Sequence, residues 1–86
     1  MQVMTKTNLG TLRQELKEVP GKNLKKVAQE DLAREAGLRV TTYRNVEQGR
    51  ATTYKKANAI LEALNRLRKD RGLEPVTLDD LGINIA

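Results

Sequence analysis

Residues 29–49 decide the fold of this chain, and they read Gln-Glu-Asp-Leu-Ala-Arg-Glu-Ala-Gly-Leu-Arg-Val-Thr-Thr-Tyr-Arg-Asn-Val-Glu-Gln-Gly. Apolar residues recur at helical spacing in both halves, and Gly37 separates the halves. We expect one helix over about 29–36 and a second that begins at Val40 or Thr41 and ends at Gln48, before Gly49. The stretch therefore predicts two short amphipathic helices hinged at one glycine.

Upstream of this stretch, apolar residues recur at helical spacing until Pro20-Gly21 interrupts the pattern. Thr7 or Asn8 is placed to cap the first turn of the predicted helix. The apolar residues on this helix are Leu9, Leu12, Leu16 and Val19.

Downstream, Thr52 or Thr53 is placed to cap a long helix that ends near Arg71, before Gly72. Glu74-Pro75 breaks the chain, and Thr77 then caps a short fifth helix. Residues 82–85 alternate apolar and polar, as is typical of a strand. The apolar stripe of the long helix consists of Ala57, Ile60, Leu61 and Leu64.

The chain has 86 residues, which is the size of one domain with a single small core. It contains two tyrosines but neither Phe nor Trp, so the core must be built from Leu, Ala, Ile and Val, which favours helices. We predict a compact all-α domain of four to five helices over 1–86. Its parts are a flexible basic arm at 1–6, the helix pair at 29–49, and a C-terminal helix and tail at 73–86.

The absence of Cys and His excludes disulfides, zinc fingers, thiol nucleophiles and imidazole bases. No cofactor or metal is expected, and an enzyme is the weakest reading, because catalysis would need carboxylates or a lysine in an enclosed pocket. The opening Met-Gln-Val-Met-Thr-Lys lacks an apolar signal core, and no stretch approaches the length of a membrane helix. We expect a cytoplasmic protein without a membrane partner.

The net charge of +5 is unevenly distributed along the chain. Residues 1–28 carry +4 and residues 50–72 carry +5, whereas residues 29–49 carry −1 and residues 73–86 carry −3. An anionic polymer that touches both basic blocks would fit this pattern. The alternative is a set of ordinary solvated lysines and arginines, so the charge alone does not decide between them.

The second helix of the pair has the side chains that a helix needs to read bases. Tyr43 and Val46 supply two anchors toward the core, and the opposite face carries polar side chains. Asn and Gln can make paired hydrogen bonds to adenine, and Arg can make them to guanine. The outward side chains are Thr41, Arg44, Asn45 and Gln48, with Arg39, Val40 and Thr42 at the leading end.

These residues closely resemble the Xre/Cro/CI family of lambda-repressor-like helix-turn-helix regulators. In that family a Gln-x-x-Leu-Ala-x-x-x-Gly core leads into a recognition helix that ends in Glu-x-Gly, and this chain has both elements over 29–49. The resemblance implies a lambda-repressor-like DNA-binding domain. One departure is Arg39, which stands where the family usually has a capping Ser or Thr. If Thr41 caps instead, the helix begins later.

The resemblance implies a role for each matching residue. Gln29 matches the glutamine that contacts a phosphate and braces the recognition helix, and Lys22, Lys25 and Lys26 precede it. The residues that would read bases are Val40, Thr41, Thr42, Arg44 and Asn45. The residues that would contact phosphate are Gln29, Lys22, Lys25, Lys26, Arg39, Gln48, Arg50, Thr53, Lys55 and Lys56.

Each role has a plainer alternative. Gln29 could serve only as a hydrogen-bonding residue at a helix N-terminus, and Asn45 and Gln48 could be merely solvated. Glu47 is better explained by pairing with Arg44, Arg50 or another basic residue than by reading a base, and Tyr43 by burial in the core. The basic run 66–71 lies too far along its helix to reach DNA. Its interaction with the helix dipole, or with an acidic partner surface, explains it better.

The leading hypothesis is a sequence-specific regulator of double-stranded DNA, a dimeric repressor that reads the major groove with helix 40–48. A homodimer is also a reasonable expectation for so small a core. The alternative is an antitoxin-type interaction module that sequesters a partner protein. In that case DNA binding would serve autoregulation.

Overall fold

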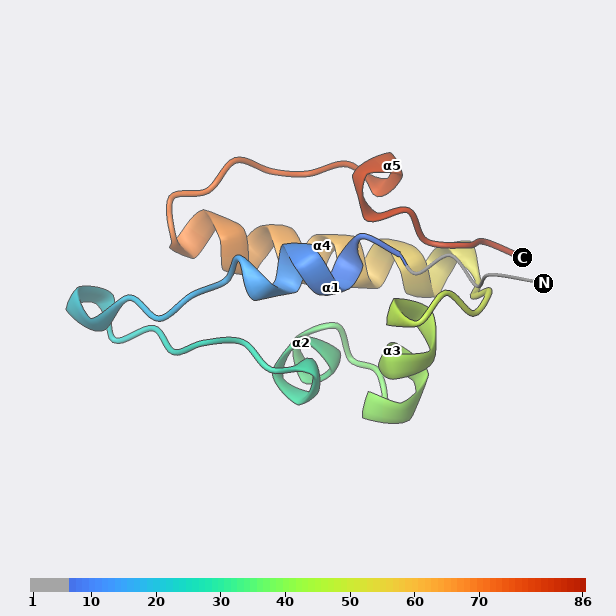
Figure 1. The fold of residues 1–86 in the computed structure, drawn as a ribbon, viewed down its shortest axis with the longest axis horizontal. Helices are drawn as coiled ribbons and strands as arrows, with labels where there is room; N and C mark the ends of the chain where they lie inside the picture. Colours follow the sequence, from blue (N-terminus) through green and yellow to red (C-terminus); the bar gives the residue numbers. More distant parts are fainter. Residues whose placement is uncertain (1–6) are drawn as a thin grey trace.

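The computed structural model describes residues 7–86 and contains five α-helices and one 3₁₀ turn in this part of the chain (Figure 1). The elements are α1 (Leu9–Gln14), η1 (Pro20–Lys22), α2 (Gln29–Glu35), α3 (Val40–Glu47), α4 (Tyr54–Asp70) and α5 (Leu78–Leu81). The prediction of an all-α domain is confirmed. The expected basic arm at 1–6 lies outside the described residues.

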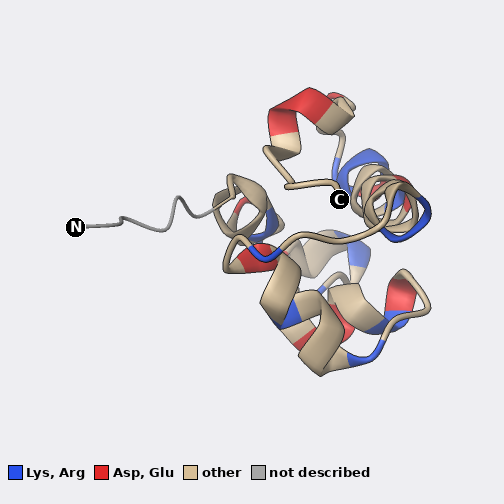
Figure 2. Ribbon diagram, turned by 90° about the vertical axis from the view of Figure 1, so that its right-hand side faces the viewer, with Lys and Arg blue, Asp and Glu red and all other residues tan. Residues whose placement is uncertain are grey.

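The long helix α4 lies at the centre of the molecule along its long axis, and the shorter helices pack around it (Figure 1). Helices α2 and α3 lie on one side of it and α5 lies on the opposite side, with α1 between them (Figures 1 and 2). The acidic first turn of α5, with Asp79 and Asp80, therefore lies on the opposite side of the molecule from the α2–α3 pair (Figure 2). In residues 7–86, no helix is both long and apolar enough to cross a membrane.

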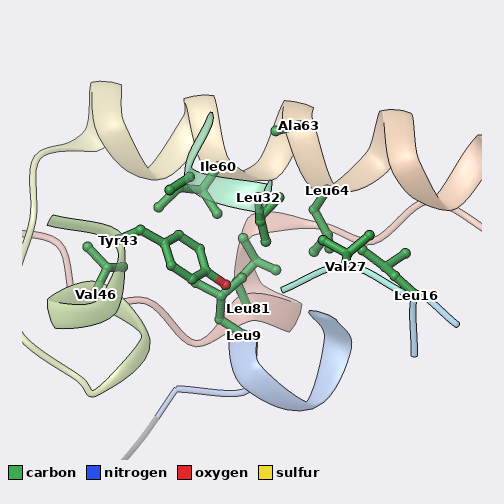
Figure 3. Packing of buried hydrophobic residues seen from close by; sticks show 11 residues of the cluster. Leu9, Leu16, Val27, Leu32, Tyr43, Val46, Ile60, Ala63, Leu64 and Leu81 are labelled. Carbon is green, nitrogen blue, oxygen red and sulfur yellow. The ribbon is translucent and has the colours of Figure 1, made fainter. Parts of the chain in front are cut away.

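The core is aliphatic apart from one tyrosine ring, as the composition predicts (Figure 3). Tyr43 is completely buried, and its hydroxyl has no hydrogen-bond partner among the described residues. Burial raises the pKa of this hydroxyl well above its ordinary value. The ring of Tyr43 therefore anchors α3 in the core. The other fully buried large side chains are Leu9, Leu16, Leu32, Val46, Ile60, Leu64 and Leu81.

Helix α1 is shorter than predicted, because it ends at Gln14 whereas the apolar spacing continues to Val19. Pro20 disfavours a helical conformation at the residue before it, and Val19 is not helical and pairs with Leu24 across η1. Leu16 is still buried, although it lies outside the helix. Of the two candidate caps, Thr7 accepts the Leu9 amide through Oγ1 at 3.3 Å.

The turn between α2 and α3 has the conformation that glycine favours. Gly37 has φ of +73°, and the amide of the next residue, Leu38, donates to the carbonyl of Ala33 at 2.8 Å. Helix α3 then begins at Val40, with Arg39 extended in the N-cap position. In the described part of the chain, Arg39 makes no side-chain cap hydrogen bond. Thr41 therefore lies in the first turn of α3 and does not cap it.

The predicted caps of the two C-terminal helices, and the predicted end of the first of them, are confirmed. Thr53 caps α4 by accepting the Lys56 amide at 3.2 Å, and Gly72, with φ of +70°, follows the helix end. Thr77 and Asp80 form the capping box of α5. Beyond α5 the tail forms one parallel β-bridge, between Ile85 and Thr52.

Candidate nucleic-acid interface

Helix α3 presents its polar face outward, because its apolar residues are held by the core. Tyr43 is 0 % exposed and Val46 is 2 % exposed. Thr41, Arg44 and Gln48 are exposed, whereas Thr42 and Asn45 are half-buried. Val40 is also half-buried and packs against the core cluster. Of the five predicted base readers, Val40 is therefore the least available.

One hollow beside α3 gathers five of the predicted contact residues. It lies between α3 and the N-terminus of α4, where Thr53 is the cap. Half-buried polar side chains of α3 face it on one side, and cations face it on the other. The predicted residues that line it are Thr42, Asn45, Arg50, Thr53 and Lys56.

A second hollow lies on the other side of α3, at the N-terminus of α2. Three predicted residues, Lys26, Gln29 and Arg44, line it together with Arg13 and Glu30. The Nε of Arg44 donates to Oε1 of Gln29 at 3.1 Å, and its Nη2 lies 3.8 Å from Oε1 of Glu30. The outward face of α3 therefore has a cationic hollow on each side.

Glu47 joins three helices through one carboxylate. The Nε of Arg13 on α1 lies 3.2 Å from Oε2 of Glu47, and the Nη2 of Arg13 lies 3.2 Å from Oε1. The Nε2 of Gln29 on α2 donates to Oε1 at 3.1 Å. Both carboxylate oxygens are thus engaged, and Gln29 connects them to Arg44. The expected structural role of Glu47 is confirmed, and its basic partner is Arg13.

Two members of this network escaped prediction from the sequence. Arg13 is 34 residues away from Glu47, so no local spacing links the two. Gly10 lets the carboxylate approach α1, because a Cβ at this position would lie 2.8 Å from Oε1 of Glu47. The position of Gly10 on the first turn of a short helix is the signal that could have indicated such an approach.

The pKa of Glu47 predicts how stability depends on pH. Burial tends to raise this pKa, but the hydrogen bond and charge of Arg13 outweigh it, so the pKa lies below its ordinary value of 4.5. The stabilisation is therefore complete above pH 4.5 and is lost as the pH falls through the lower, folded-state pKa. We expect the thermal midpoint of the wild type to fall more steeply below pH 4.5 than that of Glu47→Gln, in parallel calorimetric scans.

Asp80 also has a lowered pKa, because the backbone amide of Thr77 donates to it. Its titration is present in both proteins, so the difference between their two pH profiles isolates Glu47. Parallel profiles would show that the carboxylate of Glu47 contributes nothing to acid sensitivity.

The three predicted lysines before α2 lie in different places. Lys22 donates from Nζ to the carbonyl of Asp70 at 3.3 Å, at the C-terminal end of α4. Thr53 is at the other end of this 17-residue helix, roughly 25 Å away. The structure therefore does not bring Lys22 to the interface, because η1 carries it to the wrong end of α4. Lys25 is exposed on the segment that leads to α2, and Lys26 lines the second hollow.

The remaining predicted phosphate contacts surround the outward face of α3. Arg39 is exposed directly before α3, and Gln48 is exposed directly after it. Lys55 is exposed on the first turn of α4. None of these three side chains lines either hollow, and Gln48 borders a further hollow between α3 and α1.

The basic run at the end of α4 binds groups of the protein itself. Arg66 donates to Oε1 and to the carbonyl of Glu35, and Arg68 donates to Oε1 of Glu15 at 2.9 Å and to the carbonyl of Glu74. Arg71 donates to carbonyls on either side of η1 and to one at the end of its own helix. Arg66 therefore connects α4 to the end of α2, and Arg68 and Arg71 connect α4 to the loops. Of the three, Arg71 also donates to a carbonyl near the end of its own helix, as expected for a residue that interacts with the helix end.

Residues 22–73 match the family model described as "Helix-turn-helix", which is more than half of the chain. The matched span contains α2, α3 and α4, and with them both hollows. No curated protein and no solved structure matches the chain.

Proposed function

Because the chain belongs to the Xre/Cro/CI-like helix-turn-helix family of DNA-binding transcription regulators, we propose that it binds one specific duplex sequence and acts as a dimeric repressor. The observation that supports this most is the outward face of α3, which has hydrogen-bonding side chains at its centre and a cationic hollow on each side. A helix of this kind fits the major groove with its borders on the two phosphate backbones.

Arg44 and Asn45 are the proposed base readers at the centre of the interface. Gln29 holds the Nε of Arg44, and the exposed Nη2 pairs with Glu30. Because an exposed ion pair contributes little free energy, this pair can open so that both Nη groups reach the O6 and N7 of a guanine. Asn45 lies at the border of the first hollow, where its amide can pair with an adenine edge. Thr41 and Thr42 add contacts at the leading end of α3, and Val40 contributes a methyl group there.

Phosphate binding is proposed on both sides of α3. On one side, Arg50, Lys55 and Lys56 surround the N-terminus of α4, where the helix dipole also favours an anion. On the other side, Lys26 and Gln29 border the second hollow. Arg39 and Gln48 complete the border at the two ends of α3. Lys25 is not part of this border, because its carbonyl accepts Nη2 of Arg71 at 2.6 Å, just beyond the C-terminal end of α4.

Dimerisation, repression and a place in the cytoplasm are further parts of the proposal. A two-fold dimer would place its two α3 helices about one turn of DNA apart, roughly 34 Å. The proposed dimer would then bind a site with the same two-fold symmetry.

Selection of bound duplexes from a random pool tests the proposal. We expect a two-fold symmetric consensus whose half-sites lie about 10 base pairs apart. Lys56→Ala should weaken binding to all duplexes, whereas Lys69→Ala, which removes the same charge at the far end of α4, should have little effect. Equal affinity for every duplex would contradict the proposal, and an asymmetric consensus would contradict the dimer. Co-purification of a stoichiometric protein would instead favour an interaction module.

A further inference from the structure

The turn that joins α3 to α4 is held by the C-terminal tail, residues 83–86. Residues 49–52 form no helix, and Gly49 has φ of +106°. The amides of Gly49 and Arg50 bond back to the last turn of α3. The carbonyl of Gly49, and the amide and carbonyl of Thr52, form their hydrogen bonds with the tail.

Three hydrogen bonds connect the tail to this turn. The Nδ2 of Asn84 donates to the carbonyl of Gly49 at 2.6 Å. The amide of Thr52 donates to the carbonyl of Asn84 at 2.9 Å, and the amide of Ala86 donates to the carbonyl of Thr52 at 2.9 Å. Thr52 is buried beneath this contact. The tail thus satisfies polar backbone groups that the turn cannot satisfy itself.

The tail is itself attached to the core through Leu81 and Ile83. Leu81, at the end of α5, is fully buried, and its carbonyl accepts the amide of Asn8 at 2.9 Å. Ile83 is half-buried and packs against the core cluster. The tail therefore fixes the α3–α4 turn relative to α5 and the core.

The turn in question carries part of the proposed interface. Arg50 lies within it, Asn45 precedes it, and Thr53 follows it, and all three line the first hollow. Ala86 of the tail lines the same hollow. A change in the turn would therefore alter the angle between the base-reading face of α3 and the phosphate-binding end of α4.

We propose that the tail aligns α3 with α4 for sequence reading and that Asn84 is a positioning residue. The inference rests on the proposed DNA-binding function. Binding to a specific site requires the base-reading and phosphate contacts at the same time, so a loosened turn must be ordered on binding and affinity is lost. Binding to unrelated DNA uses mainly the phosphate contacts and tolerates a range of angles.

Two variants remove single hydrogen bonds without touching the core. Asn84→Ala removes the donor to Gly49, and Ala86→Pro removes the donor to Thr52 while it favours the extended backbone that Ile85 already has in its bridge. Asn58→Ala is the matched control, because Asn58 is an asparagine on α4 whose side chain bonds within the same helix. Each protein is measured against the selected duplex and an unrelated duplex, together with its thermal midpoint and the hydrogen exchange of the Thr52 amide.

For both tail variants, we expect affinity for the selected duplex to fall about fivefold, affinity for the unrelated duplex to change less than about twofold, and the Thr52 amide to exchange faster. The thermal midpoint should fall by only a few degrees, and Asn58→Ala should match the wild type. Unchanged discrimination, or an equal loss for both duplexes, would overturn the inference while the proposed function stands. A wild type that does not discriminate between duplexes would overturn both.

Discussion

Arg44→Ala is expected to lower affinity for the selected duplex by about 10- to 100-fold, because a bidentate arginine–guanine pair is lost. Affinity for unrelated duplexes should fall far less, since these lack the paired contact. Titration of both duplexes at one salt concentration measures the ratio. The result would identify Arg44 as a base reader and separate this role from a general loss of charge.

Arg34→Ala provides the matched control for Arg44→Ala. Arg34 is an exposed arginine at the end of α2 that pairs only with Asp31 on its own helix among the described residues. Its removal changes the net charge by the same amount, and in residues 7–86 its side chain makes no hydrogen bond or ion pair with α3. If both variants weaken both duplexes equally, Arg44 acts through its charge and does not read a base.

Glu47→Ala should lower the free energy of unfolding by about 3 kcal/mol, the largest stability effect expected for a polar residue here. The side chains of Arg13 and Glu47 are only 11 % and 13 % exposed, so removal of the carboxylate leaves a mostly buried guanidinium without a counter-charge, bonded only to the carbonyl of Val27 among the described residues. It also frees Gln29, which holds Arg44. Urea unfolding followed by circular dichroism measures the change.

Glu35→Ala is the control for this effect, because Glu35 pairs with Arg66 at a comparable distance of 3.2 Å but both side chains are about half exposed. Exposed pairs contribute little, so we expect a loss of less than about 1 kcal/mol. Joint replacement by Arg13→Met and Glu47→Leu should cost less than Glu47→Ala alone, since no buried charge is left unpaired. Equal losses for Glu35→Ala and Glu47→Ala would show that burial adds nothing to the Arg13–Glu47 pair.

The parts of the fold that could be predicted from the sequence are those specified by local signals. Gly37 marks the turn between α2 and α3, Thr53 caps α4, and Thr77 caps α5, and each acts within a few residues of its place in the chain. The C-terminal boundary of α1 was predicted wrongly, because the apolar spacing continues to Val19 whereas the helix ends at Gln14. The spacing of apolar residues indicates which residues are buried, but it does not show that all of them lie in a helix.

Partners that are distant in sequence could not be predicted. The pattern identified Glu47 as structural, but the choice of Arg13 as its partner depends on how α1 packs across α3. The position of Lys22 could not be predicted either. It is close to Gln29 in sequence, but η1 places it beside Asp70 at the C-terminal end of α4. The base-reading and phosphate-binding assignments remain predictions, and the structure supports them by bringing most of these residues to one surface.

The arginines that bind groups of their own fold reduce the number of cations available for phosphate, and this number sets how DNA affinity depends on salt concentration. Each phosphate neutralised by a protein cation releases condensed counterions, so the logarithm of affinity falls with the logarithm of salt by about 0.9 per contact. The chain has 16 lysines and arginines, but Arg13, Arg66, Arg68 and Arg71 bind carboxylates and carbonyls of their own fold. If the phosphate contacts are Lys26, Arg39, Arg50, Lys55 and Lys56, one copy should show a slope of about −4.5. The proposed dimer, with twice as many contacts, should show a slope of about −9, so its affinity should fall steeply with salt even though four arginines of each copy are engaged within the fold.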